Sequence, residues 1–217
     1  MTMIEFVADK DHLEVSTRGL ANGTQRELVA RVRRPDLVNA AEELVRHMVL
    51  YSVAERVSLV AGETVAYGGW LLRLQASNDR LRLEALDPAH TETAYDPFVD
   101  AAVDFWADQH AVCAHCGSDF DPPRVHHLLA VSRGVLDGSD DVEGVRYPDC
   151  DDRSGWVLTD ATFDGSVRSL VVLSAGEFSR VRRSIAVLLA LPAGYRIRTS
   201  AETYDAWFDS SVATAQT

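Results

Sequence analysis

The sequence predicts an α+β fold with a mostly antiparallel sheet and about three main helices, arranged as one large domain or two packed smaller ones. Short alternating apolar runs between turn signals predict the strands. Three longer stretches with apolar residues at helical spacing predict the helices. The chain has 217 residues, of which 47% are hydrophobic and 25% charged, a composition typical of a globular protein with a sizeable core.

The first predicted elements are two strands and a helix. Residues 3–8 and 26–33 are expected to be strands, with the turn signal Asn22-Gly23 between them. Pro35 and Asp36 then open a helix, because proline fits the first turn and an acid is favourable at that end. The helix is expected to end near residue 54, and its apolar stripe consists of Leu37, Ala41, Leu44 and Met48.

A hairpin and a second helix are expected next. Two strands, at about 69–76 and 80–86, are joined by a polar turn at 77–79. Asp96 and Pro97 are predicted to be the cap and first residue of the second helix. One face of this helix carries Phe98, Ala102, Phe105 and Gln109.

The two prolines at 122–123 favour an extended link and suggest a domain boundary nearby. The predicted regions are an N-terminal α+β region at 1–118, a second domain at 119–200 and a C-terminal tail at 201–217. Within the second domain, strands are expected at about 127–132, 155–160, 168–173 and 195–198. Ser174 and Glu177 match a capping box, which predicts a third helix from there to about residue 190.

An acidic loop is expected between the first two of these strands. Residues 137–164 hold nine carboxylates and two arginines, a local charge of −7 within a chain of net charge −12. Such a surface suits a basic partner, and the alternative is a solvated loop that aids solubility. Trp156 is expected in the core. The residues predicted to face a partner are Asp140, Asp141, Glu143, Arg146, Tyr147, Asp151 and Asp152.

Cys113 and Cys116 have the spacing of one side of a tetrahedral zinc site, which His126 and Cys150 could complete. A second pair of cysteines at this spacing is absent from the sequence, so thiols without a metal are the preferred interpretation. No cofactor is therefore expected, with a structural zinc as the alternative. The sequence also lacks the motifs of a nucleophile elbow and of a phosphate-binding loop, and no catalytic residue is predicted.

Several motifs occur in an order that resembles the bacterial immunity-protein-33 family. They are the segment 142–148, Ser154-Gly155-Trp156, Thr159-Asp160, Asp164-Gly165 and the segment 189–196. The resemblance covers about residues 125–198, and residues 1–124 resemble the upstream part of longer members more loosely. It implies a cytoplasmic protein that binds and neutralises a cognate bacterial toxin without catalysis.

The functional hypothesis is therefore a non-catalytic immunity protein with a basic toxin as its partner. The alternative is a zinc-binding protein or zinc-dependent enzyme built on Cys113 and Cys116. A pI near 4.9 argues against nucleic acid as the partner. No apolar run reaches membrane-spanning length, and residues 1–10 lack the apolar core of a signal peptide, so a cytoplasmic location away from membranes is expected.

Overall fold

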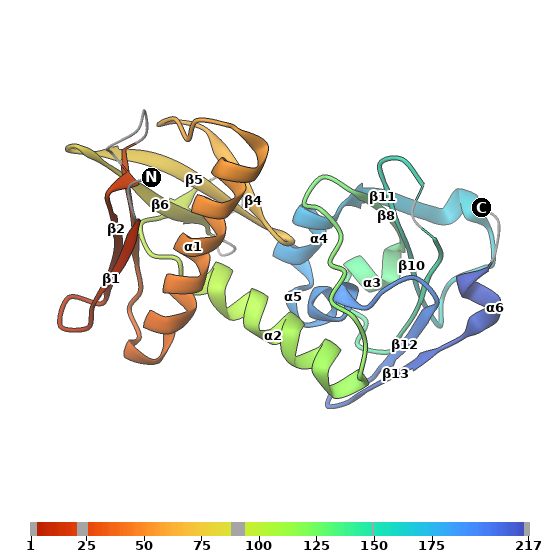
Figure 1. Ribbon diagram of the computed structural model, residues 1–217. Coiled ribbons are helices and arrows are strands. Elements are labelled where there is room, and N and C mark those ends of the chain that lie inside the picture. Colours follow the sequence, from red (N-terminus) through yellow and green to blue (C-terminus); the bar gives the residue numbers. More distant parts are fainter. Residues whose placement is uncertain (1–3, 21–25, 88–93, 149, 215–217) are drawn as a thin grey trace. The chain divides into compact units, whose positions relative to one another are not determined.

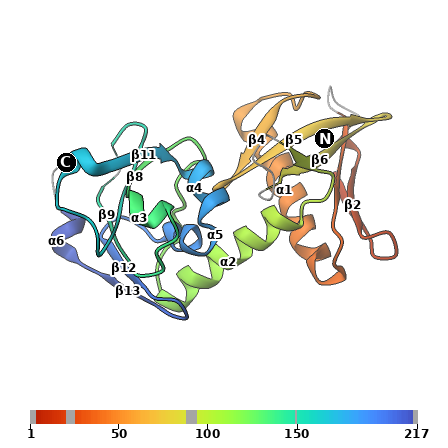
Figure 2. The ribbon, with the colours of Figure 1, turned by 180° about the vertical axis from the view of Figure 1, so that it is seen from behind.

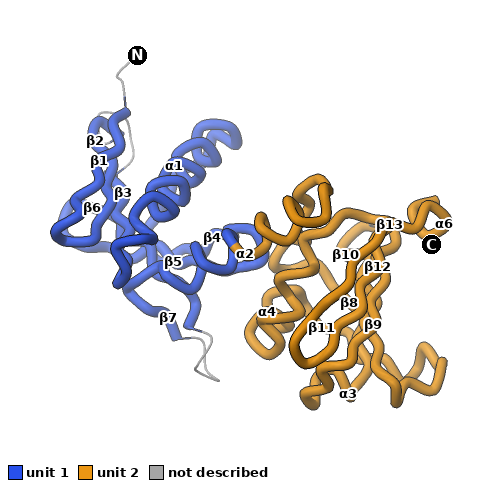
Figure 3. Tube along the Cα trace, turned by 90° about the horizontal axis from the view of Figure 1, so that it is seen from below, with its two compact units in different colours: residues 1–107 blue, residues 108–217 orange. Residues whose placement is uncertain are grey.

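The computed structural model describes residues 4–20, 26–87, 94–148 and 150–214. The chain contains two compact units, residues 1–107 and 108–217 (Figure 3). Each unit has its own sheet, and most strand pairs in both sheets are antiparallel. The α+β prediction is thus confirmed. Among the described helices, none is both long enough and apolar enough to cross a bilayer.

The sheet of unit 1 has the strand order β1-β2-β3-β6-β5-β4, with β7 beside β6. The strands are β1 (Glu5–Asp9), β2 (Glu14–Arg18), β3 (Glu27–Arg31), β4 (Thr64–Tyr67), β5 (Trp70–Ser77), β6 (Arg80–Leu86) and β7 (Tyr95–Asp96). The β5–β6 hairpin forms as predicted, with Asn78 at a φ of 55° in its turn. Strand β2 was not predicted, and the Asn22-Gly23 turn lies outside the described residues.

Helix α1 (Val38–Glu55) follows a short 3₁₀ turn, η2 (Pro35–Leu37), and lies along β1, β2 and β3 (Figures 1 and 2). All four residues of its predicted stripe are buried, and burial of this stripe against the sheet stabilises the helix more than propensity does. The helix ends at Arg56, which adopts the left-handed conformation.

Helix α2 (Asp100–Cys116) begins later than predicted. Asp96 does not cap it, because this carboxylate instead holds the Arg33 guanidinium at 2.7 Å and accepts a hydrogen bond from the Phe98 amide. Three of the four residues predicted for its inner face are buried: Ala102, Phe105 and Gln109. The prediction of a second helix was therefore right, and the prediction of its cap was wrong.

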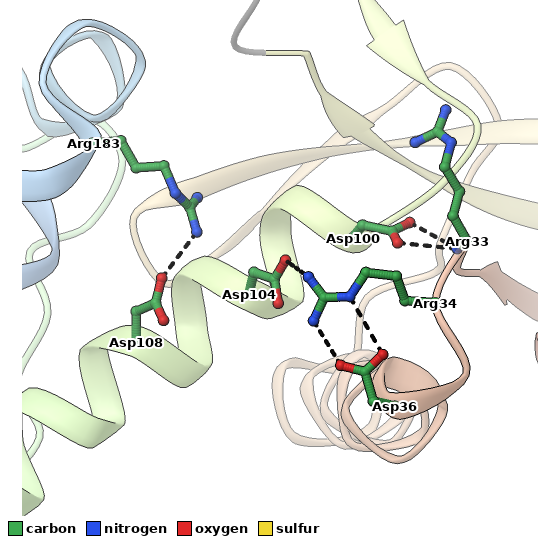
Figure 4. Close-up of polar contacts among 7 residues, drawn as sticks. All are labelled: Arg33, Arg34, Asp36, Asp100, Asp104, Asp108 and Arg183. Carbon is green, nitrogen blue, oxygen red and sulfur yellow. Dashed lines mark hydrogen bonds and ion pairs between the residues drawn. The ribbon is translucent and has the colours of Figure 1, made fainter.

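Three aspartates spaced by four residues form an acidic stripe along α2, and each is held by an arginine (Figure 4). Asp100 accepts from the backbone amide of Arg33, and Asp104 pairs with the Arg34 guanidinium at 3.0 Å within unit 1. Asp108 pairs with Arg183 at 3.1 Å within unit 2. Each part of the helix is thus bonded to the unit to which it belongs.

The sheet of unit 2 has the strand order β11-β8-β10-β9-β12-β13, and its β8–β10 pair is parallel. The strands are β8 (Leu128–Ser132), β9 (Val142–Arg146), β10 (Arg153–Asp160), β11 (Leu170–Ser174), β12 (Tyr195–Thr199) and β13 (Tyr204–Phe208). Four of them match the predicted strands. The other two are additions: β9 lies inside the predicted acidic loop, and β13 lies inside the predicted tail.

The helices of unit 2 are short. They are α3 (Arg133–Leu136), α4 (Ala175–Val181), α5 (Arg183–Ala186) and α6 (Ser210–Ala213), with 3₁₀ turns η3 (Val167–Ser169) and η4 (Val187–Ala190). The capping box at Ser174 and Glu177 is present, so the predicted start of the third helix is confirmed. The single helix predicted to run on to residue 190 is broken at Arg182, whose φ of −132° and ψ of 56° are not helical.

The core of unit 2 lies on one face of the sheet. Trp156 is buried there as predicted, and its indole nitrogen donates to the Leu189 carbonyl at 3.0 Å. Gly144 lies beside it in β9, and a Cβ at this position would come within 2.6 Å of Ile197 and 2.8 Å of Leu158. Glycine is therefore required for β9 to pack at this distance.

The capping box supplies a first test. Replacing Ser174 by alanine removes the acceptor for the Glu177 amide, so the free energy of unfolding should fall by about 0.5–2 kcal/mol in urea denaturation. The matched control is Ser184→Ala, an exposed position inside α5, which should leave stability unchanged or slightly higher. Equal stabilities for the two variants would contradict the role of the cap.

Candidate partner-binding surface

The motif-rich segment at 142–160 forms a hairpin of β9 and β10. Tyr147 donates its amide to the Gly155 carbonyl at 2.9 Å, which extends the ladder one pair beyond β9. Asp151 has a φ of 53° in the connection, and Gly155 has a φ of 75°. The register of β10 against β8 shifts between Arg153 and Val157, so Gly155 lies in an irregular stretch that favours glycine.

The hairpin separates the acidic residues that the sequence places together. Because Asp160 is opposite Val142, the carboxylates before β9 lie near the end of β10. Asp151 and Asp152 lie at the connection between β9 and β10, at the opposite end of these strands. The single acidic loop predicted from the sequence is therefore two acidic groups at opposite strand ends. Asp149 lies outside the described residues.

Arg146 was predicted to face a partner, but its side chain is fully buried. The guanidinium donates to the carbonyls of Ser154 at 3.1 Å and Leu191 at 2.7 Å, and also to the Asp121 carbonyl. It pairs in addition with the Asp121 carboxylate at 3.2 Å. The prediction for Arg146 is wrong, because this guanidinium is buried in the core, where its hydrogen bonds connect three segments of the chain.

Two of the predicted acidic residues are already paired within the unit. Asp140 lies 3.4 Å from Arg182, a buried arginine that also donates to the carbonyls of Val135 and Ser139. Glu143 pairs with the exposed Arg198 at 2.6 Å. Asp141, Asp151 and Asp152 are exposed, and Tyr147 is half-buried. The residues expected to bind a partner thus differ widely in how accessible they are.

The sheet of unit 2 presents an outer face opposite its core. On β9 and β10, alternate residues point away from Trp156, as strand geometry requires. One cross-strand row of this face follows the register through all six strands. Its members are half-buried or exposed, and they are Val172, Ala130, Val157, Val145, Arg196 and Trp207. The row therefore consists of four aliphatic side chains, then Arg196, and then Trp207, which is 46% exposed.

Four members of this row, Val157, Val145, Arg196 and Trp207, line a groove. The apolar part has a volume of about 390 Å³ and is lined by Val145, Tyr147, Val157 and Trp207, together with Arg196 and Arg198. A neighbouring hollow of about 440 Å³ shares Glu143, Thr159 and Arg198 with it. Its lining adds Asp141, Asp160 and Asp205, so this end is acidic. We call the two hollows together the outer groove.

Strand β13 forms one border of the outer groove and is tied down at its end by Asp209. The Asp209 carboxylate accepts from the Ser211 amide at 2.9 Å, which caps α6, and pairs with Arg196 at 2.8 Å. Hydrogen bonds from Ser211 and Arg196 to the charged carboxylate lower the pKa of Asp209 to about 2. The outer groove therefore has a fixed border on this side.

The predicted zinc ligands are not brought together. Within the described ranges, no group of three or more His, Cys, Asp and Glu side chains could hold a metal ion. Cys113 is buried and its thiol donates to the Ala190 carbonyl at 3.5 Å, whereas Cys150 is exposed. Burial raises the pKa of Cys113 and of Cys116, which disfavours the thiolates that a zinc ion requires. The arrangement does not fit a zinc site.

The outer groove was only partly visible in the sequence. Tyr147, Glu143 and Asp141 were predicted, but Trp207, Val145 and Val157 were not. The missed signal is alternation: in β13 the residues Asp205 and Trp207 point to the outer face, which a strand assignment at 204–208 would have predicted.

The family model of the Imm33-like domain matches residues 108–209. This segment begins at the first residue of unit 2 and includes both hollows of the outer groove. The resemblance to the immunity-protein-33 family is therefore confirmed for this segment. No curated protein and no solved structure matches the chain.

Arg146 gives a direct test of the division between core and surface. Arg146→Met leaves buried carbonyls without a donor, so the free energy of unfolding should fall by about 3–5 kcal/mol. Arg198→Met removes an exposed cation of the same type and should change stability by less than about 0.5 kcal/mol. Urea denaturation of both variants makes the comparison, and a small loss for Arg146→Met would contradict its structural role.

Asp209 gives a test by pH. Its folded pKa lies below the usual value of 3.8, so its stabilising contribution is present above about pH 4 and is lost as the pH falls through about 2. Asp209→Asn should therefore be less stable than the parent chain near neutral pH. The difference, measured in urea at a series of pH values, should shrink as the pH approaches 2. A difference that stays constant with pH would contradict this assignment.

Proposed function

We propose that this protein is a non-catalytic immunity protein that neutralises a basic bacterial toxin in the cytoplasm by binding it through the outer groove. The Imm33-like domain supports the theme of toxin immunity. The observation that carries the proposal is the outer groove itself, which joins an apolar floor to an acidic end inside the matched segment.

The chemistry of the outer groove suits a protein ligand. Aromatic side chains at the centre of an interface supply a large part of the binding free energy, and Tyr147 and Trp207 both line the apolar part. Carboxylates at the border attract a cationic partner and exclude an anionic one. A bound toxin would be neutralised because the immunity protein covers the surface that its substrate needs.

The charges available for this attraction are Asp141 and Asp205. Both are exposed, and both line the acidic end. Glu143 contributes less net charge there because Arg198 pairs with it. Asp160 accepts hydrogen bonds from Ser132, at the end of β8, and from Thr162, in the turn that follows β10. Hydrogen bonds from Ser132 and Thr162 also lower the pKa of Asp160.

The proposal is tested by reversing Asp141 and Asp205 to lysine together. Association with a basic toxin encoded beside the gene for this chain should slow by roughly tenfold or more at low salt, and its salt dependence should flatten. Trp207→Ala should raise the dissociation constant by roughly tenfold or more. Binding kinetics at low and high salt measure both effects, and protection of cells from the toxin should fall in parallel.

The matched control reverses Glu55 and Glu63, two exposed acids of unit 1, and thus changes the net charge by the same amount. Association should remain close to that of the parent chain. If both double variants slow association equally, the association rate depends on net charge alone and the outer groove is not the toxin-binding site. If neither variant nor Trp207→Ala changes binding, the proposed surface is wrong.

A further inference from the structure

Strand β13 is an edge strand, because β12 is its one partner in the sheet of the described residues. Two backbone hydrogen bonds at the ends of this strand pair show which backbone groups point toward β12. The amide of Asp209 donates to the Gly194 carbonyl, and the amide of Ser200 donates to the Thr203 carbonyl. Hydrogen-bonded pairs of an antiparallel ladder recur every two residues. The inward groups are therefore those of Asp205 and Trp207, and the amides and carbonyls of Tyr204, Ala206 and Phe208 point away from β12.

Lysine, proline and a bulge, three common obstacles to edge pairing, are absent from β13. Natural edge strands are commonly interrupted by lysine, proline or a bulge, whereas β13 has a regular five-residue register with β12 and the sequence Tyr-Asp-Ala-Trp-Phe. Its three aromatic side chains are exposed to 37%, 46% and 55% for Tyr204, Trp207 and Phe208. An exposed apolar edge of this kind is a template for an added strand.

The opposite edge of the same sheet is less suited. At β11 the amide of Ser174 is already bonded to the Glu177 carboxylate at 2.9 Å. The exposed cation Arg168 lies two residues before β11. β13, in contrast, carries Asp205 and follows Glu202, and both are exposed acids. Charge complementarity therefore directs a basic strand to β13.

A second copy of the chain is a poorer occupant of this edge. The whole chain has a net charge of −12, so two copies repel each other over distances set by the ionic strength. A cationic segment is instead attracted to this edge, because its lysine or arginine side chains can lie beside Asp205. Its alternate apolar side chains can pack on the aromatic residues of β13.

We infer that β13 receives an extended, basic segment of the partner protein as an additional antiparallel or parallel strand, which continues the six-stranded sheet. This inference rests on the proposed function and specifies how the partner binds. The amide of Ala206 donates to the added strand, and the side chains of that strand alternate between the outer groove and the side of Tyr204 and Phe208.

The test uses the full chain and a defined probe, an octapeptide of alternating lysine and valine with blocked ends. At millimolar peptide, hydrogen exchange at the amides of Tyr204, Ala206 and Phe208 should slow by at least severalfold, because these amides acquire acceptors. A peptide of the same composition, with its lysines and valines in two blocks, should protect them much less. Amide exchange followed by nuclear magnetic resonance resolves the three positions.

The matched variants are Ala206→Pro and Ala206→Val. Proline removes the outward donor without removing a bond to β12, so peptide binding should fall by roughly tenfold or more. Valine keeps the donor and should bind as the parent chain does. Circular dichroism checks that both variants fold, and the exchange experiment on the unaltered chain decides the question if Ala206→Pro does not.

Each result has a distinct meaning. Equal protection by both peptides, or peptide binding that changes Trp207 fluorescence without protecting the three amides, overturns strand addition and leaves the proposed function intact. Protection that increases with protein concentration in the absence of peptide assigns the edge to a second copy and overturns the inference. Protection by the alternating peptide, combined with failure of a basic toxin to bind, supports the edge as a strand acceptor and rejects the proposed function.

Discussion

The structure of unit 2 depends on the buried guanidinium of Arg146. It bonds to carbonyls of three segments that are far apart in the sequence, at Asp121, Ser154 and Leu191. The Arg146 carbonyl in turn accepts a hydrogen bond from the amide of Gly194, which lies just before β12. A cation removed from water is costly unless its donors are satisfied, so these segments must stay in place around it. This one side chain therefore joins the entry to the domain, the hairpin and the end of η4.

The sequence predicted the elements whose signals are local. The predictions of the apolar stripe of α1 and of the capping box of α4 were both correct, because each depends on residues that are close together in the sequence. The β9 strand was missed because Gly144 and Arg146 point into the core. Glycine is uncommon in strands, and arginine is uncommon at buried positions. The break at Arg182 could not be predicted, since its bonds to Val135 and Ser139 span more than forty residues.

The candidate surface was predicted in part for a related reason. Charge can be counted along the chain, but its position depends on how the strands pair. The described carboxylates of residues 137–164 are divided by the hairpin, and two of them, Asp140 and Glu143, are already paired with Arg182 and Arg198. The outer groove instead takes its acid from Asp141 together with Asp205, which lies outside the acidic segment. The proposed electrostatic steering at this surface would therefore depend on tertiary structure more than on local charge density.

Strand β9 shows why stability and binding can be separated in this domain. Its even-numbered residues point into the core, whereas Glu143 and Val145, with Tyr147 just after the strand, line the outer groove. A substitution in the first set should act on folding, and one in the second set on recognition. The same alternation in β13 places Asp205 and Trp207 on the outer groove while the backbone of Ala206 faces the open edge. An added strand could thus gain affinity from backbone bonds that any sequence offers, and specificity from the side chains of the outer groove.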